Sequence, residues 1–145
     1  MKINFIKKLI VVLFPIWIGC SGENQKGKAN GAAFEVTDAQ GHLIALEKPA
    51  ERIVCLYEPG LDALYMLQAE HRIVGLFNDV YSSDELFPFF SKMDARILER
   101  KLPVVGTNNQ GSVEQIVGLS PDLVIVHAGQ ADLIEGLRNA GMKVY

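Results

Sequence analysis

The sequence predicts an α/β fold, a three-layer sandwich built on a mostly parallel sheet and preceded by a β-hairpin. Three observations predict it. Continuous runs of apolar and β-branched residues recur along the chain, as in strands that are buried on both faces. Amphipathic helical patterns separate these runs, which implies right-handed crossovers between parallel strands. A turn-forming stretch stands between two short apolar segments ahead of them, as in a hairpin.

The elements are expected in a regular order. The hairpin turn is expected at Asp38–Gly41, with Gly41 in the position that takes a positive φ. Strands are expected at 52–57, 72–77, 102–105, 123–126 and 142–145, and helices at 61–67, 113–117 and 131–140. Residues 78–101 are irregular and suggest a loop and a helix, with Phe87, Phe89 and Phe90 as packing aromatics.

The first nineteen residues are predicted to be an export signal. Lys2, Lys7 and Lys8 precede an apolar run that is too short to span a membrane comfortably and that contains Pro15. This pattern is typical of a signal peptide, and it predicts a protein that works outside the cytoplasm, in the periplasm or at the cell surface.

A cysteine follows directly on this apolar run. The motif Gly19-Cys20-Ser21 is similar to the cleavage box of bacterial lipoproteins, although Trp17 stands where that box usually has leucine. We therefore expect a lipid on Cys20 that tethers the protein to a membrane, with cleavage and no lipid as the alternative. Residues 20–33 are polar and rich in small residues, and are expected to link the anchor flexibly to a domain at 34–145.

Composition and charge narrow the classes of partner. The chain is 49% hydrophobic and 21% charged, as in a globular protein. Without residues 1–19, which hold three of its 14 Lys and Arg residues, it has 11 basic and 17 acidic side chains, a formal charge of −6. Nucleic acid is therefore not an expected partner, because phosphate backbones require clustered cations.

Two glycines, Gly106 and Gly111, stand five residues apart between a predicted strand and a predicted helix, which is the spacing of a phosphate-binding P-loop. A P-loop also requires lysine directly after the second glycine, followed by serine or threonine. Here these positions are Ser112 and Val113. Since both chemical groups are missing, the loop is not expected to bind a nucleotide.

The residues after the second glycine predict a helix start instead. Ser112 is placed to cap the helix, and Gln115 is placed to complete a capping box with it. Glu114 then lies in the first turn, where the helix dipole favours a carboxylate by about 0.3–1 kcal/mol.

Three longer stretches carry a resemblance to a known family. They are FEVTDAQGHLIALEKPAERIVCL, PGLDALYMLQAEHRIVGL and LPVVGTNNQGSVEQIVGLSPDLVIV, followed by AGMKVY. From Phe34 to Tyr145 the chain resembles the N-terminal lobe of the class III substrate-binding proteins of ABC importers, which capture ferric siderophores, haem or cobalamin. The resemblance implies two lobes joined by one long helix, with the ligand in the cleft between them. This sequence is expected to supply only the first lobe.

The resemblance also implies a partner. In the family, a glutamate at the start of this helix docks onto arginines of the importer's membrane subunits, and Glu114 is the matching residue. A carboxylate at a helix N-terminus suits such a charge-assisted pair. A purely structural role in the first helical turn is the alternative, and the two roles are compatible.

Ligands of open α/β sheets bind outside the carboxyl ends of the strands. In this sequence those ends are polar and almost free of cations. We expect a ligand site made of Tyr57, Glu58, Asn78, Tyr81, Asn108, Asn109 and His127. Because anionic ligands usually require arginines, this set argues against a catecholate siderophore unless a second lobe supplies them.

Several of these residues have a plainer interpretation. Tyr57 is equally suited to packing beneath a loop, and Asn108 and Asn109 suit a turn because asparagine tolerates left-handed backbone. His127 is a candidate metal ligand, but a lone histidine at a strand end is more often a hydrogen-bonding residue of the rim. No metal site is therefore predicted.

The expected function is capture of an iron complex or cobalamin and its delivery to an ABC importer. No GxSxG, HExxH or paired catalytic carboxylates occur, so an enzyme is not expected. No cofactor is expected apart from the cargo itself. The alternatives are a lone lobe that docks to the permease without capturing ligand and, less favoured, an enzyme on an α/β scaffold.

Overall fold

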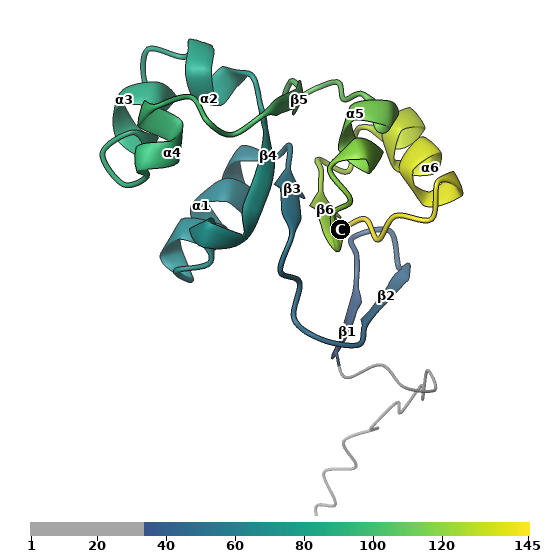
Figure 1. Ribbon diagram of the computed structural model, residues 1–145. Coiled ribbons are helices and arrows are strands. Elements are labelled where there is room, and N and C mark those ends of the chain that lie inside the picture. The colour runs from purple at the N-terminus through teal and green to yellow at the C-terminus, as the bar shows by residue number, and fades with distance from the viewer. Residues whose placement is uncertain (1–33) are drawn as a thin grey trace, which may run out of the picture.

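The computed structural model describes residues 34–145, so the predicted leader, Cys20 and the linker lie outside the described residues. Two sheets organise this part of the chain (Figure 1). β1 (Phe34–Thr37) and β2 (Leu43–Leu46) pair as an antiparallel hairpin, and four strands form a parallel sheet in the order β5-β4-β3-β6. These strands are β3 (Ile53–Cys55), β4 (Ile73–Phe77), β5 (Val104–Gly106) and β6 (Leu123–Ile125).

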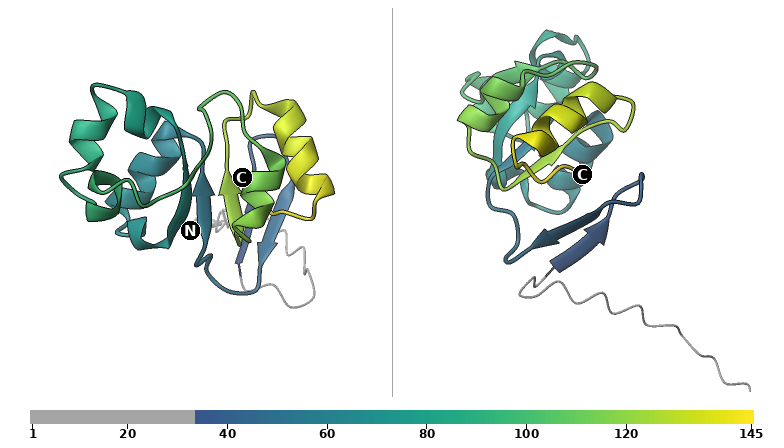
Figure 2. Two further views of the ribbon diagram at one scale, coloured as in Figure 1. Left: turned by 45° about the horizontal axis from the view of Figure 1, so that its top comes forward. Right: turned by 90° about the vertical axis from the view of Figure 1, so that its right-hand side faces the viewer.

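Helices cover both faces of the parallel sheet (Figures 1 and 2). α1 to α4 lie on one side of it, and α5 and α6 pack against each other on the opposite side. The predicted three-layer α/β sandwich with a leading hairpin is therefore confirmed. The helices are α1 (Glu58–Met66), α2 (Asp79–Ser82), α3 (Leu86–Phe90), α4 (Ala95–Leu98), α5 (Val113–Gly118) and α6 (Ala131–Asn139), with a 3-10 turn at Glu70–Arg72.

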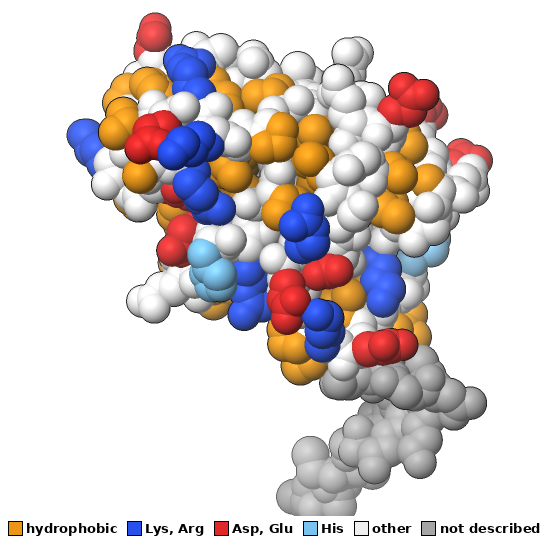
Figure 3. Space-filling model, in the orientation of Figure 1, with side chains coloured by type: hydrophobic (Ala, Val, Ile, Leu, Met, Phe, Trp, Pro, Cys, Tyr) orange, Lys and Arg blue, Asp and Glu red, His pale blue; other side chains and the backbone are white. Residues whose placement is uncertain are grey.

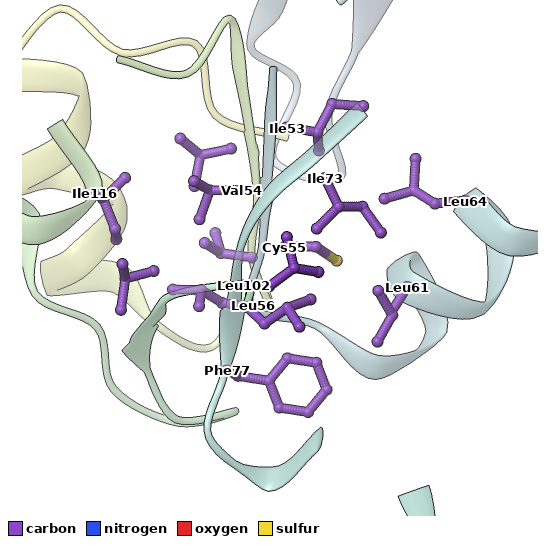
Figure 4. Packing of buried hydrophobic residues seen from close by; sticks show 14 of the residues in the cluster. Ile53, Val54, Cys55, Leu56, Leu61, Leu64, Ile73, Phe77, Leu102 and Ile116 are labelled. Carbon is purple, nitrogen blue, oxygen red and sulfur yellow. The ribbon is translucent and has the colours of Figure 1, made fainter. Parts of the chain in front are cut away.

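The core is built around β3, the strand between β4 and β6. Ile53, Val54 and Cys55 are all buried, and parallel pairing with both neighbours satisfies their backbone. Figure 4 shows these side chains between Leu61 of α1 and Ile116 of α5. A continuous apolar run is what a strand covered on both faces requires, so the prediction for this segment is confirmed.

The hairpin is fastened to α6 at its turn. Gly41 has the predicted positive φ, +86°. Asp38 Oδ1 accepts hydrogen bonds from the backbone N–H groups of Gln40 (2.9 Å) and His42 (2.8 Å), and Oδ2 pairs with Arg138 of α6. Burial opposes ionisation of Asp38, but the backbone hydrogen bonds and the neighbouring His42 and Arg138 together hold its pKa below the usual range.

The segment 78–101 departs from the prediction of one loop and one helix. It contains three short helices, α2 to α4. Phe90 is fully buried and Phe87 is partly buried, as expected of packing aromatics. Phe89 is 55% exposed, and its ring packs edge-on against Phe90 with 5.1 Å between the ring centroids.

A buried carboxylate ties this segment to α1. Asp94 caps α4 by accepting the backbone N–H of Arg96 at 2.8 Å. The Asp94 carboxylate also accepts the Arg96 guanidinium (2.7 Å) and the hydroxyl of Tyr65 in α1 (3.0 Å). The short helices are therefore held by polar contacts as well as by their aromatic residues.

The predicted last strand is only partly formed. Residues 142–145 make one parallel bridge, between Val144 and Val124, and the N–H of Tyr145 donates to the Val124 carbonyl at 2.8 Å. The segment lies along β6 as an incomplete fifth strand, because a single bridge does not make a ladder.

Candidate functional site

The parallel sheet changes its winding direction between β3 and β6. The chain leaves β3 into α1 on one face, and it leaves β6 into α6 on the opposite face. Neighbouring strands whose connections diverge in this way leave a crevice at their carboxyl ends, where α/β proteins bind ligands. Tyr57 follows β3 and His127 follows β6, and their ring centroids lie 5.5 Å apart. The structure therefore brings these two predicted residues together.

A cavity of about 500 Å³ lies beside this pair. Its walls come from α1, β6, the hairpin turn and the last residues of the chain. They include Tyr57, Gly60, Ala63, Leu67, Ile125, His127, Val144 and Tyr145. A Cβ atom at Gly60 would lie 2.8 Å from Cγ2 of Ile125, so glycine lets α1 approach β6 closely. Of the predicted ligand residues, only Tyr57 and His127 line this cavity.

The turn after β6 fixes the His127 ring. The backbone N–H of Gly129 donates a hydrogen bond to His127 Nδ1 at 3.0 Å, and the N–H of Gln130 donates to the His127 carbonyl at 3.0 Å. A Cβ atom at Gly129 would lie 2.9 Å from Nδ1, so this close contact requires glycine. The imidazole is exposed to solvent at the cavity wall.

Steric crowding explains why both ends of the 106–111 loop are glycines. Gly106 and Gly111 face each other in an antiparallel bridge. A Cβ atom at Gly106 would lie 2.4 Å from the Gln110 carbonyl oxygen, and one at Gly111 would lie 2.7 Å from Cδ2 of Leu133 in α6. The Thr107 hydroxyl oxygen closes the loop by accepting the Gln110 N–H at 3.0 Å. The spacing that resembles a P-loop therefore reflects close packing, against backbone atoms at Gly106 and against leucine side chains at Gly111.

One buried side chain, which the sequence did not single out, joins this loop to the turn after β6. Gln130 is 8% exposed, and its Nε2 donates to the Asn108 carbonyl at 2.9 Å. Gln130 Oε1 and Asn108 Oδ1 are both buried, and within residues 34–145 neither has a hydrogen-bond partner. The only sequence signal for Gln130 was its position directly before a predicted helix.

Tyr81 lies apart from the cavity and is committed to other contacts. Its hydroxyl donates to the Leu102 carbonyl at 3.1 Å, and its ring packs against Phe87. The Arg100 guanidinium stacks over both rings, 5.2 Å from the centroid of Tyr81 and 4.8 Å from that of Phe87. Arg100 is a cation that the sequence did not connect with the predicted ligand site, because 19 residues separate it from Tyr81.

The remaining predicted residues lie at loop and helix starts. Asn78 is exposed after β4, and its Nδ2 donates to the Ser82 hydroxyl at 3.1 Å. Asn109 is exposed in the 106–111 loop, where its N–H donates to Thr107 Oγ1 at 3.3 Å, as the turn interpretation expects. Glu58 is half-buried as the first residue of α1.

The start of α5 presents the predicted docking acid. Ser112 Oγ accepts the Gln115 N–H at 3.3 Å, which confirms the predicted cap. The reciprocal half of the capping box is wrong, because the Ser112 N–H donates to the Val105 carbonyl instead. Glu114 is exposed, and the described part of the chain shows no ion pair to it.

The surface of residues 34–145 is chemically mixed. Figure 3 shows acidic and basic side chains interspersed on the face in view. Within the described range there is no group of three His, Cys, Asp or Glu side chains suited to a metal ion. No helix of this range is long and apolar enough to cross a membrane.

Sequence comparison places the chain in a known family. A family model described as "Periplasmic binding protein" matches residues 53–145. An uncharacterized ABC transporter substrate-binding lipoprotein of Bacillus subtilis, YvrC, is 29% identical over 129 residues, which cover 84% of this chain and 36% of the relative. The chain thus spans about a third of the length of this relative.

Solved structures agree with this assignment. The TroA-like periplasmic binding protein FepB of Veillonella parvula is 29% identical with a TM-score of 0.57, over 76% of this chain and 35% of its own. The molybdate-bound periplasmic protein MolA of Haemophilus influenzae is 19% identical with a TM-score of 0.67, over 77% and 33% of the two chains, and so shares the fold. The chain belongs to the periplasmic binding protein family, in the class III group that its sequence motifs predict.

Proposed function

We propose that the chain is the N-terminal lobe of an extracytoplasmic receptor that captures an iron complex or cobalamin and delivers it to an ABC importer. The observation that carries the proposal is the crevice between β3 and β6, where Tyr57 and His127 stand beside a cavity. Pockets that combine apolar walls with a few hydrogen-bonding groups suit ligands with broad apolar faces and polar edges. The lipoprotein relative supports a role in import.

Binding to the purified chain tests capture. Isothermal titration with a ferric hydroxamate, haem or cyanocobalamin should saturate for at least one of these probes. Tyr57→Ala should then weaken binding about tenfold, or 1.4 kcal/mol, because it removes one wall of the crevice. Met66→Ala is the matched control, since this α1 side chain is 85% exposed and lies outside the cavity. No saturation with any probe, or equal losses in both variants, would contradict capture by this lobe.

A second candidate function is docking without capture, and the exposed Glu114 favours it. Vesicles that contain the importer's membrane subunits should bind the wild-type chain, and Glu114→Gln should weaken that binding because it removes the charge while keeping the helix cap. Glu135→Gln is the control, since Glu135 is also an exposed helical glutamate. Vesicle binding without any binding of the three probes would favour docking alone. If Glu114→Gln and Glu135→Gln bound the vesicles equally well, Glu114 would have only its structural role in the first turn of α5.

The proposal includes an anchor. Residues 1–19 act as a cleaved leader, Cys20 carries a lipid, and residues 20–33 tether the lobe. Cys20→Ser should move the protein from the membrane fraction to the soluble fraction and abolish labelling with palmitate. Cys55→Ala removes the buried cysteine of β3 and should leave both unchanged. Palmitate labelling that survives Cys20→Ser would refute the anchor.

A further inference from the structure

We infer that the turn formed by residues 127–130 holds His127 as a hydrogen-bond donor through Nε2, so that His127 recognises an acceptor atom at the edge of the cargo and does not ligate its metal. The part of the inference that concerns cargo rests on the proposed function. The part that concerns the His127 tautomer rests only on the contacts of the turn.

The tautomer follows from one hydrogen bond. A neutral imidazole carries a single proton, and the nitrogen without that proton is the acceptor. His127 Nδ1 lies 3.0 Å from the backbone N–H of Gly129, which is always a donor. Nδ1 is therefore the nitrogen without the proton, and Nε2–H is the donor. The other tautomer would direct two N–H groups at each other across the same 3.0 Å.

The turn that supplies this N–H is anchored on both sides. β6 precedes it, and Gln130 begins α6 by accepting the Ile134 N–H at 3.0 Å. The side chain of Gln130 is buried and bonded to the Asn108 carbonyl of the neighbouring loop. The Gly129 N–H is thus held against the ring by the fold.

Metal ligation needs the opposite arrangement. A metal-binding histidine offers its unprotonated nitrogen to the metal and donates its other N–H to a carboxylate or carbonyl. In His127 the second nitrogen accepts a hydrogen bond instead, so freeing Nε2 for a metal would break the contact with Gly129. The site therefore suits a complex whose metal takes no ligand from His127 and which presents carbonyl or carboxylate oxygens at its periphery.

Nitrogen NMR tests the tautomer without any cargo. Long-range ¹⁵N–¹H spectra of the full chain in detergent should show His127 with an unprotonated Nδ1 and a protonated Nε2, with His42→Gln and His71→Gln to assign the signals. Gly129→Ala should lose this pattern, because its Cβ would lie 2.9 Å from Nδ1. Gly118→Ala should keep it, since a Cβ there meets nothing within 4 Å. A protonated Nδ1 in the wild-type chain would overturn the inference.

A haem titration tests the mode of recognition. The visible spectrum of bound ferric haem should be the same in the wild type and in His127→Gln, since no imidazole bonds to the iron. His127→Leu should weaken affinity about tenfold, and more than His127→Gln does, because only glutamine keeps an N–H donor. Imidazole-iron bands that disappear in His127→Gln would overturn the inference. If the wild-type chain binds none of the probes, the proposed function fails, while the nitrogen spectra still decide the tautomer.

Discussion

Replacing Gly106 by alanine should destabilise the lobe, because the added methyl group meets backbone atoms that cannot rotate away. A Cβ there would lie 2.4 Å from the Gln110 carbonyl oxygen and 2.7 Å from Cα of Gly111. Ordinary contacts of a Cβ atom begin at 3.4 Å, so the two sides of the 106–111 loop would have to separate by about 1 Å.

The cost can be worked from the bonds that this separation breaks. The Thr107 N–H donates to the Gln110 carbonyl at 2.5 Å, and the Ser112 N–H donates to the Val105 carbonyl at 3.0 Å. Each backbone hydrogen bond contributes about 0.5–1.5 kcal/mol net, so losing both costs about 1–3 kcal/mol. We therefore expect the free energy of unfolding to fall by about 2 kcal/mol, and the midpoint temperature to fall by about 4–8 °C for each kcal/mol.

Urea unfolding followed by circular dichroism measures this loss. Gly118→Ala is the matched control, because a Cβ at Gly118 in α5 meets nothing within 4 Å. This control should gain about 0.5 kcal/mol through its less flexible unfolded state. The steric reasoning would be refuted if Gly106→Ala cost less than about 0.5 kcal/mol, or if both substitutions changed stability with the same sign and size.

Three further predictions concern titratable groups. Burial opposes ionisation of Asp94, but hydrogen bonds from Arg96 and Tyr65 outweigh it and lower the Asp94 pKa. The ionised Asp94 therefore stabilises the fold above the unfolded pKa of about 3.9, and this stabilisation is lost as pH falls through the lower native pKa. Asp94→Asn should cost about 2 kcal/mol at neutral pH and flatten this acid dependence in urea unfolding; an unchanged pH profile would contradict it. Burial raises the pKa of Cys55 to about 12, so a thiol reagent at neutral pH should modify Cys55 only after denaturation, as mass spectrometry would show. Asp38→Ala removes the oxygen that accepts the Gln40 and His42 N–H groups, so it should speed hydrogen exchange of these two amides and leave that of β4 unchanged. Equal exchange rates in the wild type and the variant would show that these hydrogen bonds do not protect the hairpin turn.

The centre of the fold was predictable because its middle strand, β3, is short and fully buried. An uninterrupted apolar run such as Ile53–Cys55 has few alternatives to a strand covered on both faces. The segment 78–101 was harder, since its helices are only four or five residues long and show little periodicity. One residue type typical of helix caps does stand at a helix start there, since Asp94 caps α4 by accepting the Arg96 N–H.

The candidate site was predictable only where the chain order places residues at strand ends. Tyr57 lies just beyond the end of β3 and His127 just beyond the end of β6, so the rule for parallel sheets places both at one edge. Arg100 and Gln130 were missed because their partners, the Tyr81 ring and the Asn108 carbonyl, are distant in sequence. Local patterns carry no information about such contacts.

The 106–111 loop connects the two features on which the proposed receptor function depends. On one side, the Asn108 carbonyl holds Gln130, whose turn orients His127 beside the cavity. On the other side, the chain passes directly from this loop through the Ser112 cap to Glu114 on α5. We proposed a cargo contact for His127 and a permease contact for Glu114, and the positions of both residues therefore depend on one tightly closed loop. Because its closure requires glycine at Gly106, the steric constraint there supports both proposed contacts at once.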